Sequence, residues 1–99
     1  MRNSALQVDS RDKSQSTPLH WASQSLSYEV VRYLIAWGAN VDAVDDRGYT
    51  PLHLVIKNAM TDPLSAIDIV RQLIEAGANT QIYDNSEQVA SQYVELVMD

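Results

Sequence analysis

The chain has 99 residues, no cysteine and a formal net charge of −6, and these properties exclude several classes of function. The length suits a single domain over residues 1–99, and the lack of cysteine excludes disulfides and thiolate metal sites. The negative charge argues against nucleic acid or an anionic membrane as a partner, because both attract a basic patch. No apolar run approaches the ~20 residues that a membrane span needs.

Two parts of the chain repeat each other. Residues 8–20 match residues 41–53, which lie 33 positions later, with seven identities in thirteen positions. Residues 31–40 match residues 70–79, 39 positions later, with seven identities in ten. Self-similarity at this spacing indicates supersecondary units that stack on one another. The six-residue difference between the two spacings indicates an insertion in the second repeat.

These spacings predict how the chain is divided. Two complete repeats are expected at about residues 8–40 and 41–79, with the insertion at about 58–66. Residues 80–99 are expected to form a degenerate repeat that caps the stack. Residues 85–88 resemble a capping box, which predicts a final helix over about 86–97. The apolar side of that helix consists of Val89, Ala90, Tyr93, Val94 and Val97.

The first helix of each complete repeat is predicted to begin at the motif Thr-Pro-Leu-His. The threonine stands where an N-cap belongs, and the proline takes the first helical position, where its missing N–H costs nothing. The motif residues are Thr17, Pro18, Leu19 and His20 in the first copy and Thr50, Pro51, Leu52 and His53 in the second. The predicted helices cover about residues 18–25 and 51–58.

The second helix of each repeat is predicted from a cap and an apolar stripe with i, i+3 and i+4 spacing. In the first repeat the expected cap is Ser27, and the stripe is Val30, Val31, Leu34 and Ile35. In the second repeat Asp62 and Pro63 start a helix that is expected to run to about residue 76. Its stripe is Leu64, Ile67, Val70, Leu73 and Ile74. Gly38 and Gly77 take the C-terminal position that favours a left-handed backbone.

An Asp-rich stretch follows the helix pair. In its better preserved copy, residues 40–48 read NVDAVDDRG, which predicts a turn-rich β-hairpin leading into the next Thr-Pro. The order of these elements predicts an all-α solenoid of stacked helix pairs with short hairpin connections.

This combination of Thr-Pro-Leu-His, a helix pair and a closing Gly-Ala-Asn resembles the ankyrin repeat, whose signature includes T-P-L-H-x-A at a period of 33. Residues 17–22 keep the whole signature, whereas Val55 replaces its alanine in the second copy. Leu26 stands where the family usually has a glycine between the helices. The resemblance is strong over residues 8–80 and weak over 81–99, and it implies an ankyrin-repeat solenoid.

The two histidines, His20 and His53, admit two interpretations. They are either metal ligands or bases, or they are structural residues that tie each helix start to the preceding hairpin, as the resemblance implies. Equivalent residues of neighbouring repeats lie roughly 10 Å apart, whereas zinc–nitrogen bonds measure ~2.0–2.1 Å. One ion therefore cannot hold both rings, and we expect no metal site.

The acidic residues of the Asp-rich stretches suggest calcium as an alternative. They lack the D-x-[DN]-x-[DN]-G-x5-E pattern of a calcium loop, and turn formation explains them better. These residues are Asp9, Asp12, Asp42, Asp45 and Asp46, of which the last two are expected at a solvated hairpin tip. No phosphate-binding loop or nucleophile–base arrangement accompanies them, so we expect neither an enzyme nor a cofactor.

The resemblance implies a surface that binds a polypeptide, through hairpin tips and the concave face of the first helices. The matching hairpin positions are Lys13, Ser14, Ser16, Asp46, Arg47 and Tyr49, and the helix positions are Gln24, Ser25, Lys57 and Asn58. Tyr49 beside Arg47 is the strongest candidate, because both residue types are enriched at binding hot spots. The alternative is that Tyr49 only packs against the neighbouring hairpin. The acidic tips predict a neutral or basic protein partner.

The two tryptophans are expected in different places. Trp21 is expected to pack between the helices, with a binding role as the alternative. Trp37 is expected on the outer side of the stack, where it either covers its own helix as a partly exposed residue or belongs to a second contact surface.

Two functions stay open at this point. The chain is either a protein-interaction module or a regulatory or targeting segment of a larger ankyrin-containing enzyme, channel or transcription-factor inhibitor. Residues 5–8 match the register of residues 38–41, which is expected where an upstream repeat finishes. Since at least three repeats are usually needed for stability, Ala5, Leu6 and Val8 are expected to border an apolar end-face that self-associates. The expected location is intracellular, cytoplasmic or nuclear.

Overall fold

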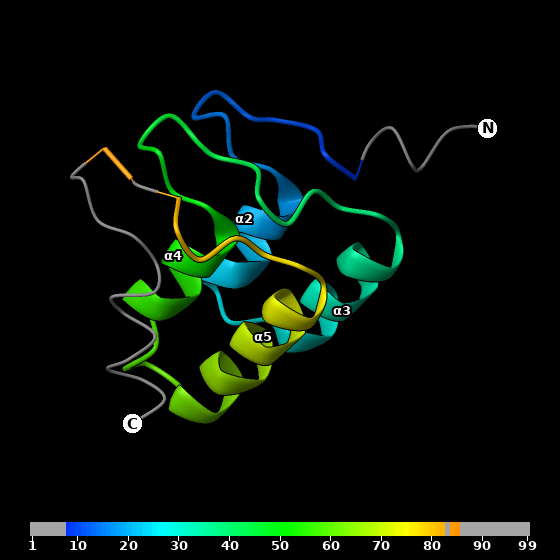
Figure 1. Cartoon of the computed structure of the whole chain (residues 1–99), viewed down its shortest axis with the longest axis vertical. Helices are drawn as coiled ribbons and strands as arrows, with labels where there is room; N and C mark the ends of the chain where they lie inside the picture. Colours follow the sequence, from blue (N-terminus) through cyan, green and yellow to red (C-terminus); the bar gives the residue numbers. More distant parts are fainter. Residues whose placement is uncertain (1–7, 83, 86–99) are drawn as a thin grey trace.

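The computed structural model describes residues 8–82, 84 and 85, and this part of the chain contains four α-helices (Figure 1). They are α2 (Pro18–Gln24), α3 (Tyr28–Ala36), α4 (Pro51–Lys57) and α5 (Pro63–Glu75). No strand is assigned among the described residues, so the Asp-rich stretches form turns and loops. The predicted C-terminal capping helix and the end-face residues Ala5 and Leu6 lie outside the described residues. Val8 was expected to border the same end-face, but it is buried in the hydrophobic core.

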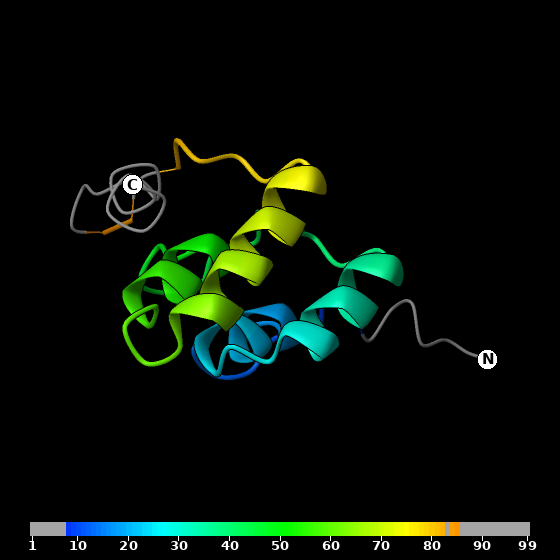
Figure 2. The same cartoon turned by 90° about the horizontal axis from the view of Figure 1, so that it is seen from below.

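The four helices form two stacked pairs. Within each pair the helices contact each other, α2 with α3 and α4 with α5, and between the pairs α2 contacts α4 and α3 contacts α5. Figure 2 shows the α4–α5 pair lying on one side of the α2–α3 pair. The first helices thus make one layer and the second helices the other, as the repeat predicts. None of these helices is long and apolar enough to cross the hydrocarbon core of a membrane, within the part of the chain described.

Local capping explains where the helices begin. The hydroxyl of Thr17 accepts a hydrogen bond from the backbone N–H of His20, and Thr50 does the same for His53, with proline at the first helical position in both. The carboxylate of Asp62 accepts from the N–H of Ser65 and starts α5, as expected. Ser27 stands at the N-cap of α3, but its side chain makes no capping hydrogen bond.

Leu26 lies between α2 and α3 in the left-handed region, with φ of 57°. This conformation is costly for a residue with a Cβ, by roughly 1–2 kcal/mol. The side chain of Leu26 is buried in the hydrophobic core, which offsets that cost. Leu26 thus takes a backbone conformation that glycine adopts readily.

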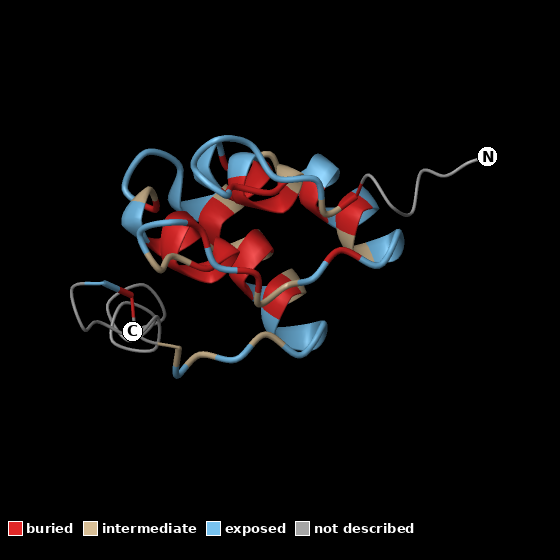
Figure 3. Cartoon of the chain, turned by 90° about the horizontal axis from the view of Figure 1, so that it is seen from above, coloured by how far each residue is buried: buried red, intermediate tan, exposed pale blue. Residues whose placement is uncertain are grey.

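The core lies between the two helix layers, and the buried sides of the ribbons face one another there (Figure 3). The predicted apolar stripes have the correct helical period, but some of their residues face solvent instead of the core. In α5 the buried residues are Ala66, Ile69, Val70 and Leu73, whereas Leu64 and Ile74 are exposed. In α3 Val31 and Leu34 are buried and Val30 is exposed. Apolar residues occur on more than one side of α5, so periodicity alone leaves its rotation open.

Hydrogen bonds between loops fix the position of each repeat relative to the next. Loop 1 (residues 12–16) and loop 2 (residues 45–49) are each closed by a 3.0 Å backbone bond between their end residues. The N–H of Asp46 donates to the carbonyl of Ser14 (3.0 Å), and the N–H of Asn85 donates to the carbonyl of Arg47 (2.9 Å). The same type of contact therefore joins loop 1 to loop 2 and loop 2 to the next loop.

A second hydrogen bond between successive repeats recurs after the ends of the second helices. The carboxylate of Asp9 accepts a hydrogen bond from the N–H of Asn40 (3.0 Å), and that of Asp42 accepts from the N–H of Asn79 (2.8 Å). The Asp-rich stretches are thus structural, which supports turn formation over a calcium site.

Candidate functional site

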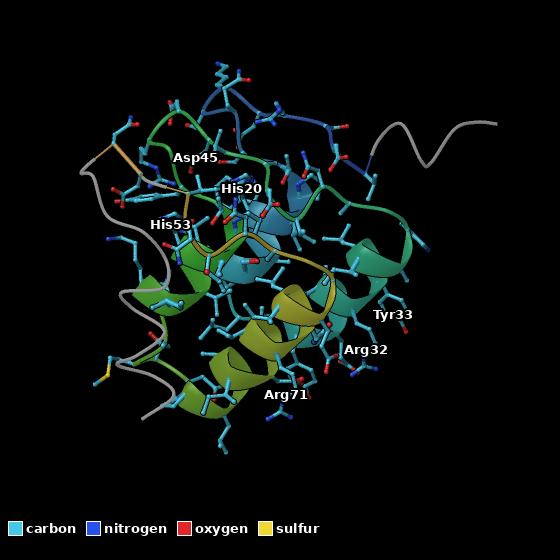
Figure 4. All side chains as sticks on the ribbon, in the orientation of Figure 1. His20, Arg32, Tyr33, Asp45, His53 and Arg71 are labelled. Carbon is cyan, nitrogen blue, oxygen red and sulfur yellow. The ribbon has the colours of Figure 1, made fainter. Side chains whose placement is uncertain are left out.

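His20 connects the first repeat to the second. Its Nδ1 accepts a hydrogen bond from the N–H of Thr17 (3.0 Å), so Nε2 carries the ring proton and donates to the carbonyl of Tyr49 (2.8 Å). The Nδ1 of His53 accepts from the N–H of Thr50 (3.1 Å) in the same way. Both rings are buried and act structurally. Figure 4 shows them beside the first helices, α2 and α4. The Nε2 contact of His20 runs to the following loop, not to the preceding one that the sequence suggested.

The environment of His20 favours its neutral form. Burial lowers the pKa of the imidazole below its ordinary value, and the carbonyl of Tyr49 and the charge of Asp45 oppose this only in part. Among the described residues, no group of three or more histidine, aspartate or glutamate side chains is arranged to hold a metal ion.

Asp45 organises loop 2. Its Oδ1 accepts hydrogen bonds from the N–H groups of Arg47 (2.9 Å) and Tyr49 (3.0 Å), and its Oδ2 accepts from the guanidinium of Arg47 (2.8 Å). In loop 1 Asp12 makes the equivalent bonds to the N–H groups of Ser14 and Ser16. Both carboxylates thus fold a turn around one oxygen, as Asx residues do.

The expectation that Asp45 is solvated at a hairpin tip is wrong. The residue is only 5% exposed, because its carboxylate points into the loop that it holds. Desolvation works to raise the pKa of Asp45, but hydrogen bonds from Arg47 and from the N–H of Tyr49 outweigh it and lower the pKa overall. Asp46, the next residue, is exposed as expected.

Three of the candidate binding residues come together around one ring, and we call them the Tyr49 cluster. The guanidinium carbon of Arg47 lies 4.8 Å from the ring centroid of Tyr49, and the Nζ of Lys57 lies 5.0 Å from it. The ring of Tyr49 is also 5.8 Å from that of His53, centroid to centroid. Loop 2 supplies Arg47 and Tyr49, and α4 supplies Lys57, so the cluster joins a loop tip to a first helix.

The other loop candidates differ in their exposure. Lys13 and Ser14 are exposed in loop 1, where the sequence placed them. Ser16 is buried, because its N–H and its carbonyl both bond to Asp12 inside the loop. Ser16 therefore does not belong to the accessible surface.

The remaining candidates, Gln24, Ser25 and Asn58, line one shallow groove of about 680 Å³. Trp21 and Val30 line it as well, and none of its lining residues is charged. We call it the Trp21 groove. Asn58 also has a structural role, because its side-chain amide donates a hydrogen bond to the carbonyl of Leu54 (2.8 Å).

The expectation that Trp21 packs between the helices is wrong. Its side chain is 55% exposed, and its indole N–H donates to Oδ2 of Asp12 (3.0 Å). The repeat alignment could have predicted the exposure of Trp21. Leu54 occupies the same place one repeat later, where a preceding helix pair covers it, whereas no described repeat precedes Trp21. Trp37 is exposed on the outer helix, as expected.

A second groove of about 450 Å³ lies between α3 and α5. Its lining includes Arg32, Asp68 and Glu75, so it differs from the Trp21 groove in being charged. Arg32, Tyr33 and Arg71 lie on the second helices, on the far side from the buried histidines (Figure 4). No candidate from the sequence falls in this groove.

Comparison with known proteins gives consistent matches along most of the chain. A family model described as ankyrin repeats, in three copies, matches residues 3–84. The chain is similar to a probable palmitoyltransferase, AKR2, of Saccharomyces uvarum, with 34% identity over 86 residues, which are 87% of this chain and 11% of that protein. It is 36% identical to human inversin over 70 residues, covering 71% of this chain and 6% of inversin.

Human transient receptor potential cation channel subfamily A member 1 is similar as well. It is 35% identical over 78 residues, which cover 79% of this chain and 6% of the channel subunit. The chain thus spans between 6% and 11% of the length of these three relatives.

Proposed function

Because the chain belongs to the ankyrin-repeat family, we propose that it is a module that binds a polypeptide partner through its loop tips and the concave face of its first helices. Ankyrin repeats are generally non-catalytic protein-interaction modules. A stack of helix pairs presents a preordered surface, which limits the entropy lost on binding. The proposal involves no cofactor. We also propose an intracellular location, because ankyrin repeats are commonly found there.

The Tyr49 cluster is the observation that carries the proposal. Tyr49 is half-buried, with its backbone held by Asp45 and His20 and its ring next to two cations. An aromatic side chain that is rigid before binding loses little entropy on contact, and tyrosine and arginine are enriched at hot spots. Lys13, Ser14 and Asp46 of the loops and Gln24 and Ser25 of α2 and its C-cap extend the proposed surface.

The charge of the chain supports a neutral or basic partner. The formal net charge of the chain is −6, and exposed carboxylates lie within the proposed surface at Asp46 and in loop 1 at Asp12, although the surface also carries the cations Lys13, Arg47 and Lys57. The net charge of the whole chain disfavours a strongly acidic polypeptide, because like charges repel as the two molecules approach. The sequence assigns self-association to other residues, Ala5, Leu6 and Val8, none of which belongs to the Tyr49 cluster.

Two double variants of matched composition test this surface. Arg47→Ala with Tyr49→Ala removes the proposed anchor, and Arg32→Ala with Tyr33→Ala removes an exposed Arg–Tyr pair from α3. Polypeptides retained by the immobilised chain are identified by mass spectrometry, and the dissociation constant of each purified candidate is then measured. We expect a specific partner whose dissociation constant rises at least tenfold, by more than about 1.4 kcal/mol, in the first variant only.

Circular dichroism shows whether each variant keeps its helices. Equal binding by the native chain and by the Arg47–Tyr49 variant, with helical signal intact, contradicts the proposed face. Loss of binding in the Arg32–Tyr33 variant alone moves the surface to the second helices.

The small share of its relatives' length that the chain covers supports a second candidate function. A segment that matches 6–11% of larger proteins fits a regulatory or targeting part of an ankyrin-containing enzyme, channel or transcription-factor inhibitor. The length of the native gene product, read from its transcript and checked by immunoblot, tests this. A native product of 99 residues contradicts this second candidate and leaves the first in place.

A further inference from the structure

Loop 1 and loop 2 are closed by equivalent hydrogen bonds but differ at the residue that takes a left-handed backbone. In loop 2 this residue is Gly48, with φ of 82°. In loop 1 the equivalent residue, 33 positions earlier, is Gln15, with φ of 64°. A left-handed backbone costs little for glycine but is unfavourable for a residue with a Cβ. Loop 1 therefore carries a backbone strain that loop 2 avoids.

Arg11 makes a contact to loop 1 that has no counterpart in loop 2. The Nη1 of its guanidinium donates one hydrogen bond to the carbonyl of Gln15 (2.7 Å) and another to the carbonyl of Val44 (2.8 Å). This nitrogen carries two hydrogens, so it can serve both acceptors, and both bonds have the short length of charge-assisted ones. The position of Arg11 is taken by Val44 itself in the second repeat, and a valine side chain has no donor. We call these two bonds the Arg11 clamp.

The Arg11 clamp holds loop 1 against loop 2. Gln15 belongs to loop 1, and Val44 directly precedes loop 2, which lies beside loop 1 (Figure 1). The backbone bond from the N–H of Asp46 to the carbonyl of Ser14 (3.0 Å) joins the same two loops at a second point. One bond alone would let loop 1 pivot on loop 2, whereas contacts at two separate points restrict that motion.

Other bonds hold each loop by itself. Asp12 and Asp45 accept hydrogen bonds from N–H groups of their own loops, and the indole of Trp21 donates to Asp12. These bonds keep the shape of each turn but do not cross from loop 1 to loop 2. Loss of the Arg11 clamp is therefore expected to change how loop 1 sits on loop 2 and to leave the turns and the helices in place.

We propose that Arg11 is a positioning residue that joins the two loop tips into one surface for the polypeptide partner. This inference rests on the proposed function and adds that the partner contacts both loops at once. The joined surface consists of Lys13 and Ser14 on loop 1 and Arg47 and Tyr49 on loop 2. Two loops that are fixed relative to each other before binding lose less entropy on contact than two that move independently.

Amide hydrogen exchange of the free chain, measured by NMR, tests the Arg11 clamp without any partner. In Arg11→Ala the N–H of Asp46 is expected to exchange at least about fivefold faster than in the native chain, because its bond to loop 1 opens more often. The N–H of Asn85 is the internal reference, since it makes the equivalent bond between loop 2 and the next loop. Arg71→Ala is the matched control, because Arg71 is an exposed arginine of α5 and its loss changes the net charge equally. An Asp46 exchange rate that Arg11→Ala leaves unchanged overturns the proposal.

A binding measurement separates positioning from direct contact with the partner. The partner is the purified polypeptide that the immobilised chain retains in the test of the proposed function. Arg11→Ala and Arg11→Lys are both expected to raise its dissociation constant at least about fivefold, because lysine keeps the positive charge but lacks the planar guanidinium. Arg71→Ala is expected to bind with native affinity. Native affinity in Arg11→Lys, together with faster exchange at Asp46, shows that the charge alone suffices and overturns the positioning role.

The Arg47–Tyr49 variant distinguishes failure of this inference from failure of the proposed function. If that variant loses the partner while Arg11→Ala binds it with native affinity, the partner needs loop 2 alone. That result overturns the role of Arg11 and leaves the proposed face in place. If the Arg47–Tyr49 variant binds with native affinity and intact helical circular dichroism, the proposed face is wrong, and the role of Arg11 in binding falls with it.

Discussion

His20 and Tyr49, 29 positions apart in the chain, are joined by a 2.8 Å hydrogen bond from the imidazole Nε2–H to the carbonyl oxygen. The bond fixes the end of loop 2 on the first helix of the preceding repeat. It also fixes the backbone of the residue that we propose as the binding anchor. The stability of the stack and the order of the proposed surface therefore depend on the same buried imidazole.

The first prediction concerns the pH dependence of stability through His20. Its pKa in the folded chain is lower than the ordinary value of 6.5, so below about pH 6.5 the unfolded chain binds more protons at this residue. This contribution to the free energy of unfolding is fully present above pH 6.5 and is lost as the pH falls below it. His20→Gln keeps a residue that suits the third helical position of a capping box and does not titrate.

Urea unfolding of the native chain and of His20→Gln at pH 7.5 and pH 5 checks this. We expect the stability difference between the two proteins to shrink from pH 7.5 to pH 5, because only the native chain loses the contribution of His20. A difference that is constant or grows toward pH 5 means that the folded ring accepts a proton readily, and contradicts the assigned hydrogen bonds.

The second prediction separates the two partners of the ion pair in loop 2. The carboxylate of Asp45 is buried and serves two backbone N–H groups, whereas the guanidinium of Arg47 is largely exposed. Asp45→Ala leaves those N–H groups without their acceptor and is expected to cost about 2–3 kcal/mol of unfolding free energy. Arg47→Ala removes a largely exposed ion pair and is expected to cost no more than about 1 kcal/mol.

Chemical denaturation of the two variants measures both costs, and Asp45→Asn serves as a control that retains one acceptor oxygen. The loss of unfolding free energy in Asp45→Asn is expected to lie between the losses in Asp45→Ala and Arg47→Ala. An equal cost for Asp45→Ala and Arg47→Ala shows that the ion pair, and not the turn, is what Asp45 contributes.

The third prediction is a gain of stability at Ser23. This residue of α2 is fully buried, and its Oγ has no hydrogen-bond partner among the described residues. Ser23→Ala removes an unsatisfied hydroxyl and is expected to raise the unfolding free energy by about 1 kcal/mol. Ser25→Ala is the matched control, because the Oγ of Ser25 is exposed and bonds to the carbonyl of Trp21. Thermal unfolding distinguishes the two, and a lower midpoint for Ser23→Ala refutes this prediction.

The fourth prediction concerns the close approach of loop 2 to the loop that follows. Gly48 has φ of 82°, and a Cβ there would lie 2.6 Å from Oδ1 and 2.8 Å from the backbone nitrogen of Asn85. Gly38 has a similar φ of 91° with open space around it. Gly38→Ala is therefore expected to cost only the backbone strain, roughly 1–2 kcal/mol, and Gly48→Ala distinctly more. Denaturant midpoints of the two variants provide the comparison, and equal costs show that Asn85 moves aside freely.

Much of this protein is determined by short-range chemistry that the sequence displays. The helices begin at Thr17, Thr50 and Asp62 because each offers a side-chain acceptor followed by proline, a local pattern that is independent of what packs nearby. The repeat spacing then predicts the helix pairs, their stacking and the family. The structural role of the histidines follows from their equivalent places in the two repeats.

The tertiary structure decided which side of each helix is covered and which residues meet. In α5, apolar residues on several sides left the rotation open, and packing against α3 and α4 selected Ile69 over Leu64. Asp45 is buried because its own loop closes around it. The Tyr49 cluster forms because Lys57 of α4 reaches back to loop 2. Trp21 and Leu54 share a motif position, but only Leu54 has a described helix pair stacked before it, so burial depends on place in the stack and not on the motif.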